Sequence, residues 1–500
     1  MDSGACPHSA PQPMYVGEMR RAVLACMLLA FAPRACPQSN TEDSPQRLVT
    51  LNVVATNARG EPVTDLRAAD VQLREDGKPR PVVFLRFAGS KRSAAPHEVG
   101  EFVNHPTSPP VLILLDRWNE RMLTAAGAWI GLGAALERLE TVDNVYIYFL
   151  TNHGELYPVH PLPGGEPDSR AGAGPSPSEL RAKLDQAIQK SQGFRDVDAQ
   201  DPVLRVNTTF QALHTLTLQM ASIAGRKYLI WVTHGVPLTV NMFPGDWLDL
   251  TPQIRNLSEA AAQAQIAIYT VDQSASGAGA DPSGLARQTL QMFSALTGGR
   301  WYPSDSADQA IADATADARA SYRLAYYSDV RDGDRKEHKI RLATARKGIR
   351  LLTRTAFAAR TAEPDPGQVE AIAFGGARSS PFDAAEIGLR VAMSRKPGGN
   401  TVHFDIRVDP AHVLIEHRGE HYRAALAVLV ALYNNEGPLN DAMSPTDLDI
   451  DFTQSQFDRA VKEGMLIAED LRPSGQIQQT RVIVFDRNLH GLGSVTIPMK

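Results

Sequence analysis

Asp116, Glu120 and His234 are side chains whose types could do chemistry together if the fold brings them close. Asp116 ends the apolar run 111–115, Glu120 follows four residues later, and His234 comes soon after the expected strand 226–232. Two carboxylates and an imidazole form a mixed ligand set, which suits Zn²⁺ or Cu²⁺ better than Mg²⁺. One hypothesis is therefore a metal-dependent enzyme that uses these three residues.

The same residues also have a structural interpretation, which we favour. Asp116 could cap the helix that follows it, Glu120 could be a solvated acid in the first helical turn, and His234 could be a loop side chain. Trp118 has only an indole N–H donor, so it cannot ligate a metal. It is either an aromatic anchor for a partner or, as we favour, a residue that fills volume.

Catalytic motifs do not occur in the sequence. It contains neither His-Glu-x-x-His nor Gly-x-Ser-x-Gly, and its histidines are scattered. His417 and His421 are four residues apart, but their alternating apolar surroundings indicate strands or a hairpin, where this spacing does not make a metal pair. We therefore expect a protein that is not an enzyme.

Composition and length are those of a multidomain globular protein. The chain has 500 residues, 43% of them hydrophobic, and a formal net charge of −5. It lacks the clustered Lys and Arg of a nucleic-acid-binding protein, so we expect no nucleic-acid partner. Its three cysteines all lie within the first 36 residues, so the rest of the chain has no thiol for disulfide or thiolate chemistry.

The N-terminal segment 1–38 has the layout of a leader with a secretory signal peptide. Two arginines after Met19 precede the 11-residue apolar run 22–32, which is too short to span a bilayer. We expect an exported protein, periplasmic or extracellular, with no transmembrane segment after the signal peptide.

The body of the chain divides into three regions by pattern. Residues 47–88 alternate with a period near two and contain the hairpin signal Asp76-Gly77, which predicts a small N-terminal β module. The segments 89–110 and 361–379 are linkers by composition, and residues 380–500 are largely β, most simply a β-sandwich.

Between the linkers, residues 111–360 alternate strands and helices. Buried strands are predicted at 111–115, 144–150, 226–232 and 266–271, with helices at 121–140, 178–191, 208–224, 252–265, 283–297 and 307–320. This alternation is typical of a doubly wound, mostly parallel α/β sheet. Three further strands between 321 and 353 are expected to extend its edge.

Five short motifs in this order are similar to the bacterial von Willebrand factor A-related family of the acidobacterial type. They lie at 66–78, 225–232, 267–272, 296–301 and 322–327, and 422–430 also resembles the family. The resemblance covers most of the chain from 47 to 500. It implies a Rossmann-like A domain with a metal-ion-dependent adhesion site.

The resemblance implies a ligand set of Asp-x-Ser-x-Ser after the first strand, a Thr from a later loop and a second Asp. Asp116 matches the first Asp, but Trp118 and Glu120 replace the serines, and His234 stands where the second Asp is expected. Thr208 or Thr209 matches the Thr. Uncharged hydroxyls suit a small hard cation, so the adhesion site is expected to be degenerate, with Mg²⁺ or another divalent cation at Asp116 as the one cofactor candidate.

These observations predict an exported, non-enzymatic, adhesion-type binding protein. Its crevice residues Asp116, Trp118, Glu120, Thr208 and His234 would contact a protein or peptide partner. A purely structural scaffold is the other alternative to the metal-dependent enzyme.

Overall fold

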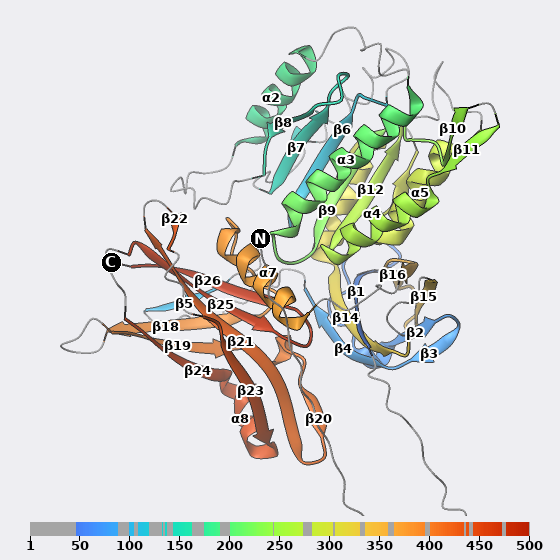
Figure 1. Cartoon of the computed structure of the whole chain (residues 1–500). Coiled ribbons are helices and arrows are strands. Elements are labelled where there is room, and N and C mark those ends of the chain that lie inside the picture. Colours follow the sequence, from blue (N-terminus) through green and yellow to red (C-terminus); the bar gives the residue numbers. More distant parts are fainter. Residues whose placement is uncertain are drawn as a thin grey trace, which may run out of the picture. The chain divides into compact units, whose positions relative to one another are not determined.

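The strands of the sheet that carries Asp116 come from the middle part of the sequence. The computed structural model describes residues 47–88, 100–104, 109–119, 133, 136–137, 144–162, 175–190, 201–243, 245–273, 283–303, 306–330, 336–358, 365–395, 401–434, 437–439, 444–472 and 477–499. This sheet has six strands in the order β13-β12-β9-β6-β7-β8 (Figure 1). They are β6 (Val111–Asp116), β7 (Val145–Leu150), β8 (Leu156–His160), β9 (Lys227–Thr233), β12 (Ile266–Asp272) and β13 (Trp301–Tyr302).

The helices around this sheet begin and end close to where the pattern places them. They are α2 (Pro177–Lys190), α3 (Pro202–Ala221), α4 (Thr251–Gln263), α5 (Leu285–Thr297) and α6 (Ala307–Arg319). Helix α3 begins six residues before its predicted start because Asp201 caps it, accepting hydrogen bonds from the N–H groups of Val203 and Leu204. Helix α5 ends at Thr297 and is capped by Gly298, which adopts the left-handed conformation with φ of 73°, so the predicted glycine cap is confirmed.

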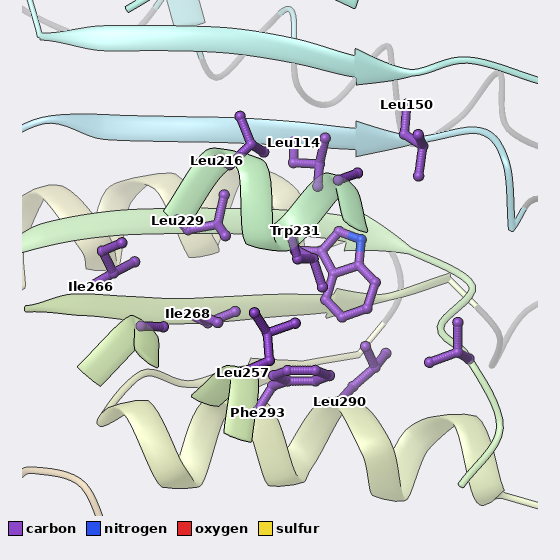
Figure 2. Packing of buried hydrophobic residues seen from close by; sticks show 14 of the residues in the cluster. Leu114, Leu150, Leu216, Leu229, Trp231, Leu257, Ile266, Ile268, Leu290 and Phe293 are labelled. Atoms are coloured by element: carbon purple, nitrogen blue, oxygen red, sulfur yellow. The ribbon is translucent and has the colours of Figure 1, made fainter. Parts of the chain in front are cut away.

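Both faces of the six-stranded sheet are apolar. Ile113 and Leu115 of β6 share a buried cluster with residues of α2 and α6, whereas Leu112 and Leu114 share another with α3, α4 and α5. In the second cluster, the Trp231 ring packs edge-on against Phe293, with 5.6 Å between ring centroids (Figure 2). The uninterrupted apolar runs of β6 and β9 follow from this two-sided burial.

The N-terminal strands pair with strands that lie far away in the sequence. One sheet has the order β16-β1-β14-β4 and another the order β17-β15-β2-β3. Their elements are β1 (Arg47–Thr56), η1 (Ala68–Asp70), β2 (Val71–Glu75), β3 (Lys78–Arg80), β4 (Val82–Phe87), β14 (Ser321–Ser328), β15 (Glu337–Thr344), β16 (Arg350–Leu352) and β17 (Ala356–Ala358).

The expectation that residues 321–353 extend the edge of the α/β sheet is therefore wrong. β14 pairs antiparallel with β1 over eight residues and with β4 on its other side, and β15 pairs with β2. The physical reason is the buried face of β14. Tyr322, Leu324 and Tyr326 complete a cluster with Val49 and Leu51 of β1.

The C-terminal region contains two antiparallel sheets, β24-β19-β18-β5 and β20-β21-β25-β26, with β22 and β23 also paired to β21. The strands are β5 (Glu101–Val103), β18 (Leu389–Arg395), β19 (Val402–Val408), β20 (Glu416–Arg418), β21 (His421–Asn434), β22 (Gly437–Pro438), β23 (Thr446–Thr453), β24 (Met465–Leu471), β25 (Gln479–Asp486) and β26 (Leu492–Pro498). Residues of both sheets share one buried cluster, an arrangement compatible with the expected β-sandwich.

Both segments expected to be linkers contain regular structure. In the first, β5 pairs with β18, and in the second, α7 (Pro366–Ser379) begins after the capping residue Asp365. Two further short elements in this region are η5 (Pro410–His412) and α8 (Gln454–Glu463). β20 and β21 form the hairpin expected around His417 and His421, in which His417 stacks on Tyr422.

The expected fold class, a doubly wound, mostly parallel Rossmann-like sheet of the von Willebrand factor A type, is wrong as a description of this chain. Most described strands pair antiparallel and are spread over several separate sheets. Four pairings are parallel, those of β6 with β7 and β9 and of β12 with β9 and β13, and β8 is antiparallel to β7. Strands with a period of two bury one face, and such strands favour antiparallel sheets.

Several predictions fall outside the described residues. They are the leader and signal peptide 1–38 with its cysteines, Glu120, and most of the expected helix 121–140. Among the residues that are described, no helix is both long and apolar enough to span a membrane.

His412, at the end of η5, makes folding stability depend on pH. Its Nδ1 atom accepts a hydrogen bond of 2.7 Å from the Gly388 N–H. Burial, together with the nearby Arg86 guanidinium, lowers the pKa of His412 from 6.5 to about 4, while Asp409 opposes this shift.

Between those two values the unfolded chain binds a proton that the folded chain does not. Stability from this group is therefore complete above pH 6.5 and is lost as the pH falls toward about 4. We expect His412→Asn, whose side-chain oxygen can replace Nδ1, to remove up to about 3 kcal/mol of that acid-induced loss. Urea unfolding at a series of pH values measures the free energy of unfolding of both proteins. The same dependence of this free energy on pH in both proteins would refute the prediction.

Candidate functional site

Asp116 ends β6 as a buried acceptor of hydrogen bonds. Its side chain is 2% exposed. Its Oδ2 atom accepts from the Trp231 indole N–H at 3.1 Å and from the Thr233 hydroxyl at 2.7 Å, both on the neighbouring strand β9. β6 and β9 are parallel, so their carboxyl ends meet and bring these three side chains together.

Asn119 connects Asp116 to helix α3. Its backbone N–H donates to Asp116 Oδ1 at 3.0 Å, and its side-chain amide lies 2.7 Å from both Asp116 Oδ2 and the Thr209 hydroxyl oxygen. Thr209 in turn donates to the Arg205 carbonyl, which also accepts from the Trp118 indole at 3.2 Å. The result is a continuous network in which every donor to the carboxylate is neutral, and the Arg205 guanidinium donates to the Asn119 side-chain oxygen at 3.5 Å.

This donor set does not fit a Mg²⁺ site. Three donors converge on Asp116 Oδ2, and neither an indole N–H nor an amide NH₂ can ligate a cation. The Asn119 amide lies between Asp116 and Thr209, and the family resemblance assigns metal binding to Asp116 and to either Thr208 or Thr209. Within the described residues, no group of three His, Cys, Asp or Glu side chains is placed to hold a metal ion.

The other predicted residues fall into different environments. Trp118 and His234 are 3% and 6% exposed, so with Asp116 they form part of the interior and not a surface that a partner can contact. Thr208 is half-buried beside Gly154, and its neighbour Thr209 is the one that joins the network. Glu120 lies outside the described residues, so the mixed site of Asp116, Glu120 and His234 stays a prediction.

An exposed aromatic hairpin lies at the same edge of the sheet. β10 (Thr239–Phe243) and β11 (Asp246–Asp249) form a two-stranded sheet in the connection between β9 and α4 (Figure 1). Phe243 is 69% exposed and Trp247 is 61% exposed, and Met242 beside them is also exposed. Sequence reasoning did not predict this hairpin, although its alternating apolar residues and Gly245 were a usable signal.

Alternation along the hairpin separates its two faces. Val240 and Leu248 are paired in register and pack into the core cluster of the sheet. Asn241 and Trp247 form the next pair and point away from that core.

Two carboxylates accompany the aromatic side chains. Asp246 is paired with Phe243 in register, and hydrogen bonds from Thr251 hold the pKa of Asp249 below its usual value. Trp247 and Asp249 are two residues apart on β11 and share the outer face, and Phe243 and Asp246 are also exposed. The exposed surface of the hairpin therefore combines large apolar groups with negative charge.

Comparisons with known proteins leave the chain without an assigned family. No family model matches it, and a search of curated proteins found no match. A superoxide reductase (neelaredoxin) from Archaeoglobus fulgidus aligns with 22% of this chain and 87% of its own, at 14% identity and a TM-score of 0.15. A β-glucosidase involved in saponin metabolism from intestinal bacteria aligns with 78% of this chain and 50% of its own, at 11% identity and a TM-score of 0.16.

Such TM-scores carry no argument about fold or function. The chain also spans only about half the length of the β-glucosidase. Membership of the von Willebrand factor A-related family therefore stays a prediction from the sequence motifs.

Proposed function

We propose that this chain is an exported, non-enzymatic binding protein that engages a protein partner through the hairpin β10–β11. The observation that supports this most strongly is the exposure of Phe243 and Trp247 on one short hairpin. Large aromatic residues are the side chains that most often dominate binding energy at protein interfaces. Leaving two of them in water is unfavourable unless a partner covers them.

The rigid base of the hairpin supports the proposal. Val240 is 2% exposed and anchors the hairpin in the core, and the Leu250 N–H donates to the Leu238 carbonyl at 3.0 Å where the hairpin joins α4. A preorganised hairpin loses little conformational entropy on binding, which favours affinity.

The charges favour a protein over a lipid surface. Asp246 and Asp249 flank the aromatic side chains, and acidic groups are repelled by anionic membrane surfaces. The partner that fits has an apolar pocket with a basic rim. The degenerate adhesion site has no metal role in this proposal, and Asp116 positions the loops of the sheet edge from within.

We expect the double substitution Phe243→Ser with Trp247→Ser to abolish partner capture while leaving the fold intact, since both side chains are exposed. Loss of two anchors of this kind weakens binding by about 4 kcal/mol or more, roughly a thousandfold. The measurement is affinity capture from an envelope extract by immobilised protein, in buffer containing a chelator.

Ile372→Ser is the matched control, because Ile372 is 74% exposed on α7, away from the hairpin in sequence. The control should capture the same protein as the wild type. Equal capture by the double variant would overturn the proposal, as would binding of the wild type to anionic lipid vesicles in place of a protein.

A further inference from the structure

A second site lies where β1, β4 and β14 approach the amino ends of β9 and β12 and the segment before β18. A cavity of about 80 Å³ opens there. Its polar lining includes Arg86, Arg226, Arg323, Asp383 and Glu386. No residue of the Asp116 network lines it, so it is separate from the hairpin edge.

The two acids in the lining already have partners. Glu386 pairs with Arg323 and accepts from the Gln265 side chain at 3.0 Å. Asp383 accepts from the Thr496 hydroxyl at 2.7 Å and forms an ion pair with Arg481. Their negative charge is therefore balanced without Arg86.

Arg86 is the cation of this cavity whose hydrogen-bonding capacity is least used. Within the described part of the chain, its buried Nε atom has no hydrogen-bond partner, and its Nη2 atom makes one long bond of 3.3 Å to the Ala385 carbonyl. Burial lowers the pKa of Arg86 to about 10, and the nearby Arg323 adds to this effect, while Glu386 and Asp409 oppose it.

The residue that follows Arg226 in the sequence is a buried lysine. Lys227 is 2% exposed and adjoins the lining residue Arg226, and burial lowers its pKa to about 7. An anion near Arg86 would stabilise the charged forms of both groups, because opposite charges interact strongly where water is excluded.

We propose that this cavity binds a small oxyanion, a phosphate or a short-chain carboxylate, through the guanidinium of Arg86. A guanidinium is a planar fork of N–H donors that matches the paired oxygens of these anions. The volume suits the proposal, since one water needs roughly 10–15 Å³ by the same measure and an inorganic phosphate has the bulk of several waters. Asn52 and Ser321, which also line the cavity, add neutral polar groups.

The test is calorimetric titration of the full chain with inorganic phosphate, with chloride at matched ionic strength as the reference. We expect saturable binding with one phosphate per chain. Arg86→Met should weaken it at least about tenfold, because a charge-assisted hydrogen bond is lost. Arg390→Met, at an exposed arginine on β18, should leave it unchanged.

A second variant keeps the test decisive if Arg86→Met does not fold. Asn52→Asp retains Arg86 but places a carboxylate in the lining, and it should also weaken phosphate binding at least about tenfold. A heat signal that chloride reproduces, or undiminished binding by Asn52→Asp, would overturn the proposal. Tighter binding of acetate than of phosphate would support the carboxylate arm of the same site.

Discussion

Asp116→Ala is expected to lower the free energy of unfolding by about 3–5 kcal/mol, the largest effect of any single polar substitution at the sheet edge. The carboxylate accepts four hydrogen bonds, and its removal leaves the buried donors of Asn119, Trp231 and Thr233 without this acceptor. Each buried donor left unsatisfied costs about 1–3 kcal/mol. Equilibrium unfolding in urea, followed by far-ultraviolet circular dichroism, measures the loss.

Asp185→Ala is the control for this prediction. Asp185 is a half-exposed acid on α2 that forms a surface ion pair with Arg181, so its removal should change stability by about 0.5 kcal/mol or less. If Asp116→Ala proved as mild as Asp185→Ala, the carboxylate would not be the structural acceptor described above.

Gly299→Ala is expected to destabilise the protein by about 3 kcal/mol or more. A Cβ atom at this position would lie 2.0 Å from the carbonyl oxygen of Ile268 in the neighbouring strand β12. That oxygen belongs to the backbone of a buried strand and cannot move away cheaply, because β12 is held between β9 and β13. Thermal unfolding with and without the substitution measures the effect.

Gly375→Ala is the matched control for Gly299→Ala. It lies within α7, and a Cβ atom there would meet nothing within 4 Å. Gly375→Ala should therefore stabilise the protein slightly, by about 0.5–1 kcal/mol, because alanine favours the helix. A stability loss at Gly375 equal to that at Gly299 would show that the close approach to β12 is not the cause.

Whether a feature of this fold could be predicted from the sequence depends on how far apart in the sequence the interacting residues lie. The strand at Asp116 and the helices α2 to α6 follow from local periodicity and caps, and these were found. The strand that pairs with β14 was not predicted, because an alternating pattern specifies which face of a strand is buried but not which distant strand it pairs with. β1 lies more than 260 residues before β14 in the sequence, and the two strands are neighbours only in the folded protein.

The same limit applies to the candidate site. Asp116 ends a buried strand, as its sequence context predicted, but its chemistry depends on neighbours that a motif does not contain. Trp231 and Thr233 face Asp116 only because β6 and β9 are adjacent, and Thr209 reaches it only through Asn119. The family resemblance made Asp116 a candidate metal ligand, and the residues themselves favoured a structural role as a helix cap. The donors that the fold assembles around Asp116 support a structural role.

Photo-crosslinking from the hairpin tests the central claim most directly, that the sheet edge binds a protein through Phe243 and Trp247 and without a cation at Asp116. A photoreactive phenylalanine analogue replaces Trp247 in one protein and Ile372 in another, and each is irradiated with envelope extract in Mg²⁺ and in a chelator. We predict one discrete protein adduct at position 247 in both buffers and none at 372. The absence of an adduct at 247, or its loss in the chelator, would contradict the account.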